Sequence, residues 1–338
     1  MIDLGVRPHK PTVAAVVRRR VNPRHIPVLA TLGLLALMYG VGVVNYPGLS
    51  NTQVTLNIFI DNAFLLVVAV GMTFVILTGG IDLSVGAVVA LTTLIAATLL
   101  KAGWPPAVVL PLLLLIGTTL GLLMGCIIHF FEVQPFIATL AGMFFARGLC
   151  FLINEQSIPI TNSFWVGAAD AEVRIKGFHL SLSALISVAV VLIAAYVLAY
   201  TRLGRNVYAI GGSAQSATLM GLPVAKTKIA VYAISGFCSA LGGVLLSFYM
   251  LSGYSLHAQG MELDAIGAVV IGGTILAGGS GYVVGTLLGV LVYGLIQTLI
   301  TFDGRLSSWW TRIFIGVLLF LFILLQRAVT RRTKMGQK

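Results

Sequence analysis

Long uncharged apolar runs, separated by short polar or Gly/Pro-rich breaks, dominate the pattern along this chain. A bilayer hydrocarbon core about 30 Å thick needs roughly 20 helical residues to cross it, and several of the runs approach that length. They lack the alternation of barrel strands, so helices must satisfy the backbone in lipid. The sequence therefore predicts an all-α integral membrane protein of about ten transmembrane helices, at 28–44, 57–77, 83–100, 107–130, 136–153, 181–200, 227–250, 263–279, 281–301 and 309–326.

Basic residues concentrate in three segments outside these spans. Lys and Arg number six in 1–27, four in 201–228 and five in 327–338, which is 15 of the 21 in the chain. Cytoplasmic loops carry such an excess, and an even number of crossings returns both termini to one side. We predict a basic cytoplasmic segment 1–27, a transmembrane permease domain 28–326 with a cytoplasmic loop 201–226, and a basic cytoplasmic tail 327–338.

Composition narrows the function. Hydrophobic residues make up 58% of the chain and charged residues 9%. The net charge of +11 reflects membrane orientation and not nucleic-acid binding, because no aromatic residues alternate with the basic ones on a polar face. Cys126, Cys150 and Cys238 sit in apolar segments without metal-ligand spacing, so we expect core residues and no metal site.

Motifs for catalysis are missing from the sequence. It contains no Gly-x-x-x-x-Gly-Lys-Ser/Thr phosphate loop, no His-Glu-x-x-His and no Gly-x-Ser-x-Gly. We therefore expect a non-catalytic chain without a cofactor of its own. Any dependence on ATP would have to come from a partner chain.

Two spans carry three glycines at four-residue spacing, which predicts close helix packing on one face of each span. The trios are Gly117, Gly121 and Gly125 in the fourth span, and Gly281, Gly285 and Gly289 in the ninth. The tetrapeptide Gly-Ala-Val-Val occurs at 86–89 and again at 267–270, five helices later. An inverted five-helix repeat would explain the recurrence, and chance similarity between apolar segments is the alternative.

Polar residues inside or between the spans give candidates for a translocation path. Gly79 and Gly80 interrupt an apolar helix that Asp82 restarts. Asp82 is expected to cap the new helix, which is compatible with a break that lines a path. Arg147 is expected to snorkel or to pair with a helix terminus and not to contact substrate. The predicted path residues are Asn57, Asp61, Asn62, Thr73, Phe74, Asp82 and Gln297.

The cytoplasmic loop contains a short helix of small residues. Ser213 is placed to cap it, and Gly221 and Pro223 to end it. Such a helix could seat in a cleft of a soluble partner, or it could be an ordinary connector. The predicted contact residues are Ser213, Ala214, Ser216, Ala217 and Gly221.

Four segments carry a family resemblance: 71–86, 207–212 (Val-Tyr-Ala-Ile-Gly-Gly), 262–266 (Glu-Leu-Asp-Ala-Ile) and 302–310 (Phe-Asp-Gly-Arg-Leu-Ser-Ser-Trp-Trp). Together they resemble the permease subunits of ribose-class ABC sugar importers over nearly all of the chain, and most of all the galactofuranose-type permease. One departure is Ala214, where ribose permeases typically carry Glu; the galactofuranose branch is similar in lacking that acid.

The resemblance implies a type II permease of the vitamin-B12-importer kind in the bacterial inner membrane. It implies a cytoplasmic ABC ATPase, a second permease subunit in a heterodimer or homodimer, a periplasmic sugar-binding protein and surrounding membrane lipid. The substrate would be a monosaccharide, galactofuranose or a pentose-like sugar. The alternative function is a secondary transporter of a small polar solute that works without an ATPase and uses an acid or His relay at mid-membrane, which the sequence does not make evident.

Overall fold

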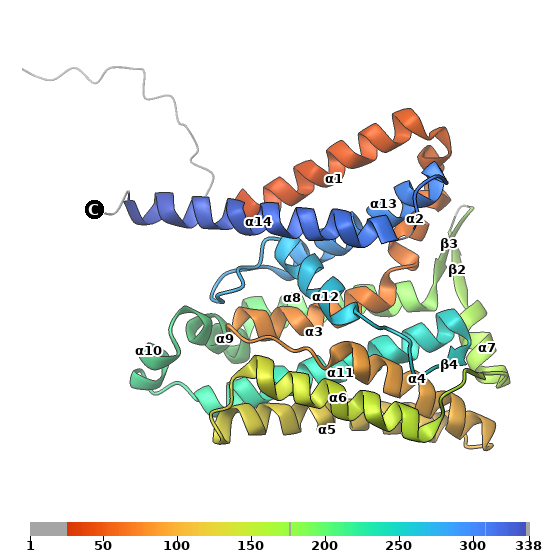
Figure 1. The fold of residues 1–338 in the computed structure, drawn as a ribbon, viewed down its shortest axis with the longest axis horizontal. Coiled ribbons are helices and arrows are strands. Elements are labelled where there is room, and N and C mark those ends of the chain that lie inside the picture. The colour runs from red at the N-terminus through yellow and green to blue at the C-terminus, as the bar shows by residue number, and fades with distance from the viewer. Residues whose placement is uncertain (1–25, 176, 308, 336–338) are drawn as a thin grey trace, which may run out of the picture.

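The computed structural model describes residues 26–335 except 176 and 308. In that part of the chain, helices lie side by side in a bundle (Figure 1). Seven of them are long and apolar enough to cross a membrane, and one bent pair makes an eighth candidate. The prediction of an all-α membrane protein is confirmed. The predicted segment 1–27 lies outside the described residues except for its last two positions, and so do residues 336–338 of the tail.

Each predicted crossing corresponds to a helix or a helix pair. In order these are α1 (Ile26–Asn45), α2 (Thr52–Ile60) with α3 (Ala63–Leu77), α4 (Val85–Lys101), α5 (Pro106–Phe130), α6 (Pro135–Ile153), α8 (Leu182–Tyr200), α11 (Val224–Met250), α12 (Met261–Ile271), α13 (Val283–Asp303) and α14 (Trp309–Met335). The connecting elements are η2 (Pro47–Ser50), β1 (Ile158–Pro159), α7 (Ser163–Asp170), β2 (Glu172–Ile175), β3 (Phe178–Ser181), α9 (Arg202–Gly212), α10 (Ala214–Leu219) and β4 (Ser252–Gly253).

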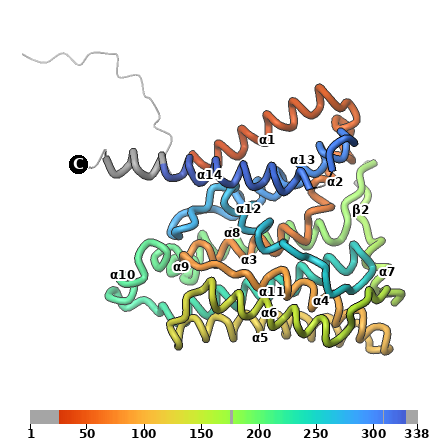
Figure 2. Tube along the Cα trace, in the orientation of Figure 1, coloured from red at the N-terminus to blue at the C-terminus, as the bar shows by residue number. Residues whose placement is uncertain are grey.

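The two ends of the bundle carry different connections. Helices α9 and α10 lie at the end where α14 also terminates, whereas α7 and the β2–β3 hairpin lie at the opposite end (Figures 1 and 2). Strands β2 and β3 pair antiparallel, as do β1 and β4. The basic loop 201–226 and the basic residues 327–335 therefore lie at the same end of the bundle.

The predicted crossing 263–279 is wrong as a continuous helix. Helix α12 has 11 residues and ends at Ile271, so it rises about 16 Å, roughly half of a hydrocarbon core. The next residues form a loop in which Gly273, Gly278 and Gly279 have φ of 95°, 87° and 77°. L-residues avoid this backbone conformation, so these glycines turn the chain where hydropathy alone suggested more helix.

Helix α11 packs against three other helices, α3, α4 and α5. The first glycine trio makes the closest of these approaches possible. A Cβ on Gly117 would collide with the carbonyl oxygen of Gly236, and one on Gly125 would lie 2.9 Å from Cα of Ile229. All three glycines of α5 face α11, where they lie against its backbone and against Cβ atoms such as that of Ala240. Backbones in lipid gain van der Waals contact from such an approach.

The second trio differs from its prediction. Gly281 precedes α13 and packs against the side chain of Thr274. Gly285 and Gly289 lie against the carbonyl groups of Gly272, just after α12, and of Ala268 within α12. The three glycines therefore do not form one helix face. Four-residue spacing places residues on one helix face only when all of them lie in the helix, and Gly281 lies before α13 begins.

Valine at Gly121 is expected to destabilise the protein by about 3 kcal/mol, because overpacking a tight contact forces the backbones apart. A Cβ at this position would collide with the carbonyl oxygen of Tyr232. The matched control is Gly148→Val in α6, where a Cβ meets nothing within 4 Å. Unfolding in detergent should distinguish the two variants. Equal stability of both would mean that the α5–α11 contact contributes little.

Candidate functional site

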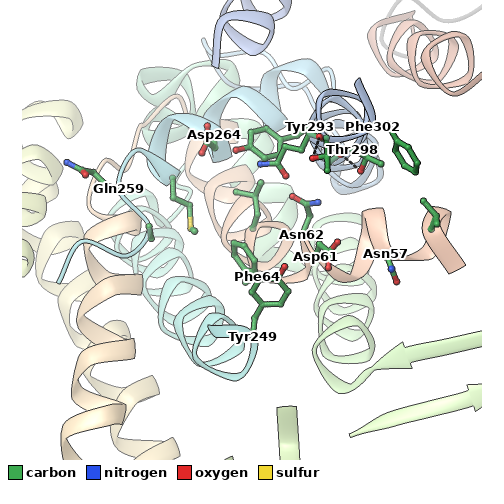
Figure 3. Close-up of a pocket in the computed structure, with 17 residues that line it drawn as sticks. Asn57, Asp61, Asn62, Phe64, Tyr249, Gln259, Asp264, Tyr293, Thr298 and Phe302 are labelled. Carbon is green, nitrogen blue, oxygen red and sulfur yellow. Dashed lines mark hydrogen bonds between the residues drawn. The ribbon is translucent and has the colours of Figure 1, made fainter. Parts of the chain in front are cut away.

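A cavity of about 560 Å³ lies where the α2–α3 bend meets α11, α12 and α13. It combines carboxylates, amides and hydroxyls with aromatic rings (Figure 3). A volume in this range suits a small organic ligand. The lining residues are Val54, Asn57, Asp61, Asn62, Phe64, Leu65, Tyr249, Ala258, Gln259, Met261, Asp264, Tyr293, Gly294, Gln297, Thr298, Thr301 and Phe302.

One wall of the cavity is a bend of 48° between α2 and α3. The Asn62 amide donates to the carbonyl oxygen of Ile58 at 2.8 Å, in place of the backbone N–H that a continuous helix would use. The Asn62 N–H donates instead to Phe59, at 3.3 Å. A side chain that enters the i→i−4 ladder is a recognised cause of a sharp kink. The kink brings Asp61 and Asn62 to the cavity.

The opposite wall is α13, which comes close to the bend at Gly294. A Cβ there would lie 3.0 Å from the carbonyl oxygen of Ile58. The Tyr293 side chain interacts with Asp264 of α12 and with Gln297 one turn along its own helix. In Figure 3, Asn62 points towards Tyr293 and Thr298 across the cavity. The described residues hold no group of three or more His, Cys, Asp or Glu that could bind a metal ion.

Four of the seven predicted path residues line this cavity: Asn57, Asp61, Asn62 and Gln297. The side-chain Oδ1 of Asn57 accepts a hydrogen bond from the side-chain amide of Gln53 at 2.9 Å. Gln53 in turn exchanges two hydrogen bonds with the backbone of His179 in β3, which ties α2 to the hairpin. The structure brings Asn57, Asp61, Asn62 and Gln297 together around one cavity. The role of these four residues in transport remains a prediction.

Thr73 and Phe74 lie outside the cavity, in the buried core around α3. The hydroxyl of Thr73 is 2.7 Å from that of Thr286, so the pair links α3 to α13. Both Thr73 and Phe74 are at most 2% exposed. Thr73 was predicted as a path residue, and in this structure its hydroxyl instead bonds within the core, to the carbonyl oxygen of Ala69 and to Thr286.

Asp82 is also absent from the cavity lining, being 1% exposed. Its Oδ1 accepts hydrogen bonds from the Ser84 N–H at 2.9 Å and the Ser84 hydroxyl at 2.6 Å, while Oδ2 accepts from the Ser235 hydroxyl at 2.7 Å. The carboxylate thus fixes the start of α4 and attaches it to α11. Asp82 does not cap α4 in the strict sense, because the N-cap is Ser84 and the helix start has no side-chain capping bond. It instead holds the N-cap residue from two positions upstream, and it lies outside the cavity lining.

Leucine at Asp82 is expected to destabilise the chain by about 3 kcal/mol or more, because it leaves buried donors without acceptors. Asparagine keeps an acceptor for Ser84 and should cost about 1 kcal/mol. Unfolding in detergent, with uptake measured in parallel, checks both values. Wild-type stability of Asp82→Leu would contradict the role in attaching α4 to α11.

Several cavity residues were missed by sequence reasoning: Tyr249, Asp264, Tyr293 and Phe302. An acid inside an apolar helix is a signal by itself, so Asp264 could have been chosen on that ground. The two tyrosines gave no such signal. Aromatic residues are common in membrane helices, and only the three-dimensional packing shows that these two face a cavity.

The loop between α8 and α11 forms two helices at one end of the bundle. The Ser213 hydroxyl accepts from the Ser216 N–H at 3.2 Å, so Ser213 caps α10 as predicted, and Gly221 follows the helix with φ of 73°. Ala217, however, is fully buried within the chain itself. The exposed apolar residues are Leu219 and Met220, at 83% and 67%. Ala217 is therefore unsuited to direct contact with a partner.

Comparisons with known proteins agree with this architecture. Residues 54–323 match the family model described as branched-chain amino acid transport system / permease component. The chain is 48% identical over 309 residues to the inner membrane ABC transporter permease protein YjfF of Escherichia coli (strain K12), which covers 91% of this chain and 93% of that protein.

Two further relatives are import permeases. The fructose import permease protein FruG of Bifidobacterium longum (strain NCC 2705) is 41% identical over 317 residues, with 92% of this chain and 93% of FruG covered. The ribose import permease protein RbsC of Haemophilus influenzae (strain ATCC 51907 / DSM 11121 / KW20 / Rd) is 41% identical over 269 residues, with 79% and 82% covered. No solved structure was found to match. The chain therefore belongs to the branched-chain amino acid transport system / permease component family, and it is a membrane permease subunit of the ABC transporter class.

Proposed function

We propose that this chain forms the translocation path of an ATP-driven importer for a monosaccharide. The cavity between the α2–α3 bend and α13 carries this proposal. Its amides, carboxylates and hydroxyls can exchange hydrogen bonds with sugar hydroxyls, and its tyrosine and phenylalanine rings offer apolar surface to a sugar ring. The fructose and ribose import permeases among the relatives support a sugar as the class of substrate.

The resemblance to the galactofuranose-type branch extends the proposal to a furanose, with galactofuranose first and pentose-like sugars next. The sequence lacks a phosphate loop, so ATP hydrolysis is assigned to a cytoplasmic ABC ATPase. The proposed assembly also contains a second permease chain and a periplasmic sugar-binding protein. Both termini and the α9–α10 end are placed in the cytoplasm, on the distribution of Lys and Arg.

Uptake by the reconstituted complex tests this proposal. The chain would be placed in proteoliposomes with its ATPase, second permease and loaded binding protein, and galactofuranose, ribose and fructose would be supplied in turn. We expect saturable, ATP-dependent accumulation of galactofuranose above the other two. Transport of an amino acid, peptide or metal ion in place of every sugar would refute the function.

One observation favours the secondary-transporter alternative enough to test it. Asp61 and Asp264 line the same cavity, and carboxylic acids within membrane helices can relay protons. The two functions differ in their energy source. Uptake by this chain alone, driven by a proton gradient without ATP, would establish the alternative. Uptake that requires ATP and stays constant when the gradient is collapsed would leave the two acids as hydrogen-bonding groups for substrate.

A further inference from the structure

The segment 251–260 between α11 and α12 is non-helical and adjoins the cavity, to which it contributes Ala258 and Gln259. Its backbone turns sharply: Ala258 and Gly260 have φ of 55° and 86°. Irregular backbone among membrane helices is tolerated only where its polar groups find partners in the protein or in water. The carbonyl groups of this segment therefore need donors from the surrounding helices.

Arg147 of α6 supplies two of these donors from one nitrogen. Its Nη1 donates to the carbonyl oxygens of Ser255 at 2.6 Å and of His257 at 2.9 Å. These bonds replace the snorkelling or helix-terminus pairing that the sequence suggested. Among the described residues, no carboxylate lies within salt-bridge distance of Arg147. An ionisable residue in a membrane helix is costly, so a dedicated backbone contact is a functional signal.

The segment is enclosed on its other sides as well. Nη2 of Arg312 in α14 lies 3.5 Å from the carbonyl oxygen of Gln259, a longer contact with a more exposed side chain. Gly86 at the start of α4 leaves room for the segment, since a Cβ there would lie 2.7 Å from the carbonyl oxygen of Ala258. Alternate carbonyls, of Ser255, His257 and Gln259, thus face arginines from two different helices.

We propose that Arg147 is a positioning residue for substrate passage, which holds segment 251–260 so that Ala258, Met261 and Asp264 form one wall of the cavity. The effect of Arg147 on transport rests on the proposed function, whereas its effect on the position of segment 251–260 does not. This structural part of the proposal does not depend on which solute passes. Arginine suits the task because its guanidinium presents several donors in a fixed plane, whereas the lysine ammonium is a compact and strongly hydrated charge.

The structural part is tested by labelling. A Gln259→Cys reporter, in a background in which the three native cysteines are replaced, would be exposed to a membrane-impermeant maleimide in the assembled complex. Arg147→Met removes both hydrogen bonds to the segment. We expect its labelling rate to rise about tenfold, since 1.4 kcal/mol is a factor of ten in an equilibrium constant. Arg147→Lys should recover part of the protection, and the matched control Arg312→Gln should change the rate less than about twofold, as exposed contacts contribute little.

The transport part is tested in the same complexes by the ratio of sugar transported to ATP hydrolysed. Arg147→Met should lower this ratio about tenfold while ATPase association and basal hydrolysis stay near wild type, and Arg147→Lys should partly restore the ratio. A general folding defect would lower hydrolysis and association together.

Unchanged labelling and an unchanged ratio in Arg147→Met would overturn the proposal. If Arg147→Met fails to fold, Arg147→Lys decides on the same two readouts. If wild-type protein transports no sugar, the proposed function fails, and the labelling comparison still decides whether Arg147 holds the segment.

Discussion

Replacing Leu219 by glutamate is expected to reduce ATP-driven uptake by about 50-fold or more, because placing a carboxylate in an apolar contact costs several kcal/mol. Leu219 and Met220 end the short helix α10 and are the large apolar side chains that project furthest into solvent there, at 83% and 67% exposure. Water-exposed apolar residues at the tip of a loop favour contact with a protein partner. The proposed partner is the ATPase, whose motion must enter the membrane chain through a cytoplasmic contact.

The fold should survive this change. Leu219 contributes little buried surface, so the variant is expected to insert, fold and bind its second permease like wild type. Gln215→Glu adds the same charge at an exposed polar position of the same helix and is the matched control, with uptake within about twofold of wild type. ATPase pull-down and sugar-stimulated hydrolysis in proteoliposomes measure the loss. Normal association and hydrolysis in Leu219→Glu would show that force enters elsewhere.

Ala217→Arg makes a useful contrast, since small residues of α10 were the contacts that the sequence suggested. Ala217 is fully buried inside its own loop. Arginine there must displace neighbouring atoms and bury a charge, so we expect a locally unfolded α9–α10 segment and not only a lost contact. Proteolysis of the loop should increase in Ala217→Arg and remain unchanged in Leu219→Glu.

The sequence predicts the helices well because lipid imposes length and apolarity locally. Its errors occur where a property depends on the partner segment. The pattern at 57–77 gave one span, and the kink at Asn62 arises from a side chain that captures the carbonyl of Ile58. The pattern at 263–279 gave another span, yet glycines with positive φ end α12 at Ile271. Hydropathy does not register either event.

The candidate site was predictable to the extent that polar atoms in lipid are rare. Asn57, Asp61, Asn62 and Gln297 were identified by that rule, and the structure places them around one cavity. Asp82 was chosen by the same rule, but its carboxylate accepts three hydrogen bonds from Ser84 and Ser235 within the core and does not line the cavity. A sequence shows that a polar group needs a partner. It does not show whether that partner is substrate, water or a neighbouring helix.

A second large effect is expected at Gly211, the penultimate residue of α9. There the end of α9, the end of α3 and the loop before α13 meet backbone to backbone. The Gly279 N–H donates to the carbonyl oxygen of Leu77 at 2.9 Å, and Gly211 lies directly against this hydrogen bond. A Cβ on Gly211 would collide with the Leu77 oxygen and the Gly279 nitrogen, and would lie 3.0 Å from Cα of Gly279.

This junction connects the proposed ATPase contact to the cavity. Helix α9 leads directly to α10, whereas α3 begins at the bend beside Asn62 and α13 carries Tyr293 and Gln297 on the far wall. A displacement of α10 would therefore act on both walls of the cavity through a contact that has no flexible side chains in it. Tightly packed backbone transmits displacement because it cannot absorb it by rotamer changes.

Gly211→Ala is expected to lower uptake about tenfold or more, because the added methyl group must separate the three backbones. Gly212→Ala is the matched control: it is the next residue of the same helix, and a Cβ there meets nothing within 4 Å. Alanine improves helix propensity at both positions by about 1 kcal/mol, so α9 itself should be stabilised in both variants. A loss confined to Gly211→Ala, with ATPase association retained and sugar-stimulated hydrolysis reduced, would assign the loss to the junction. If both variants transport like wild type, motion of α9 and α10 must reach the cavity by another route.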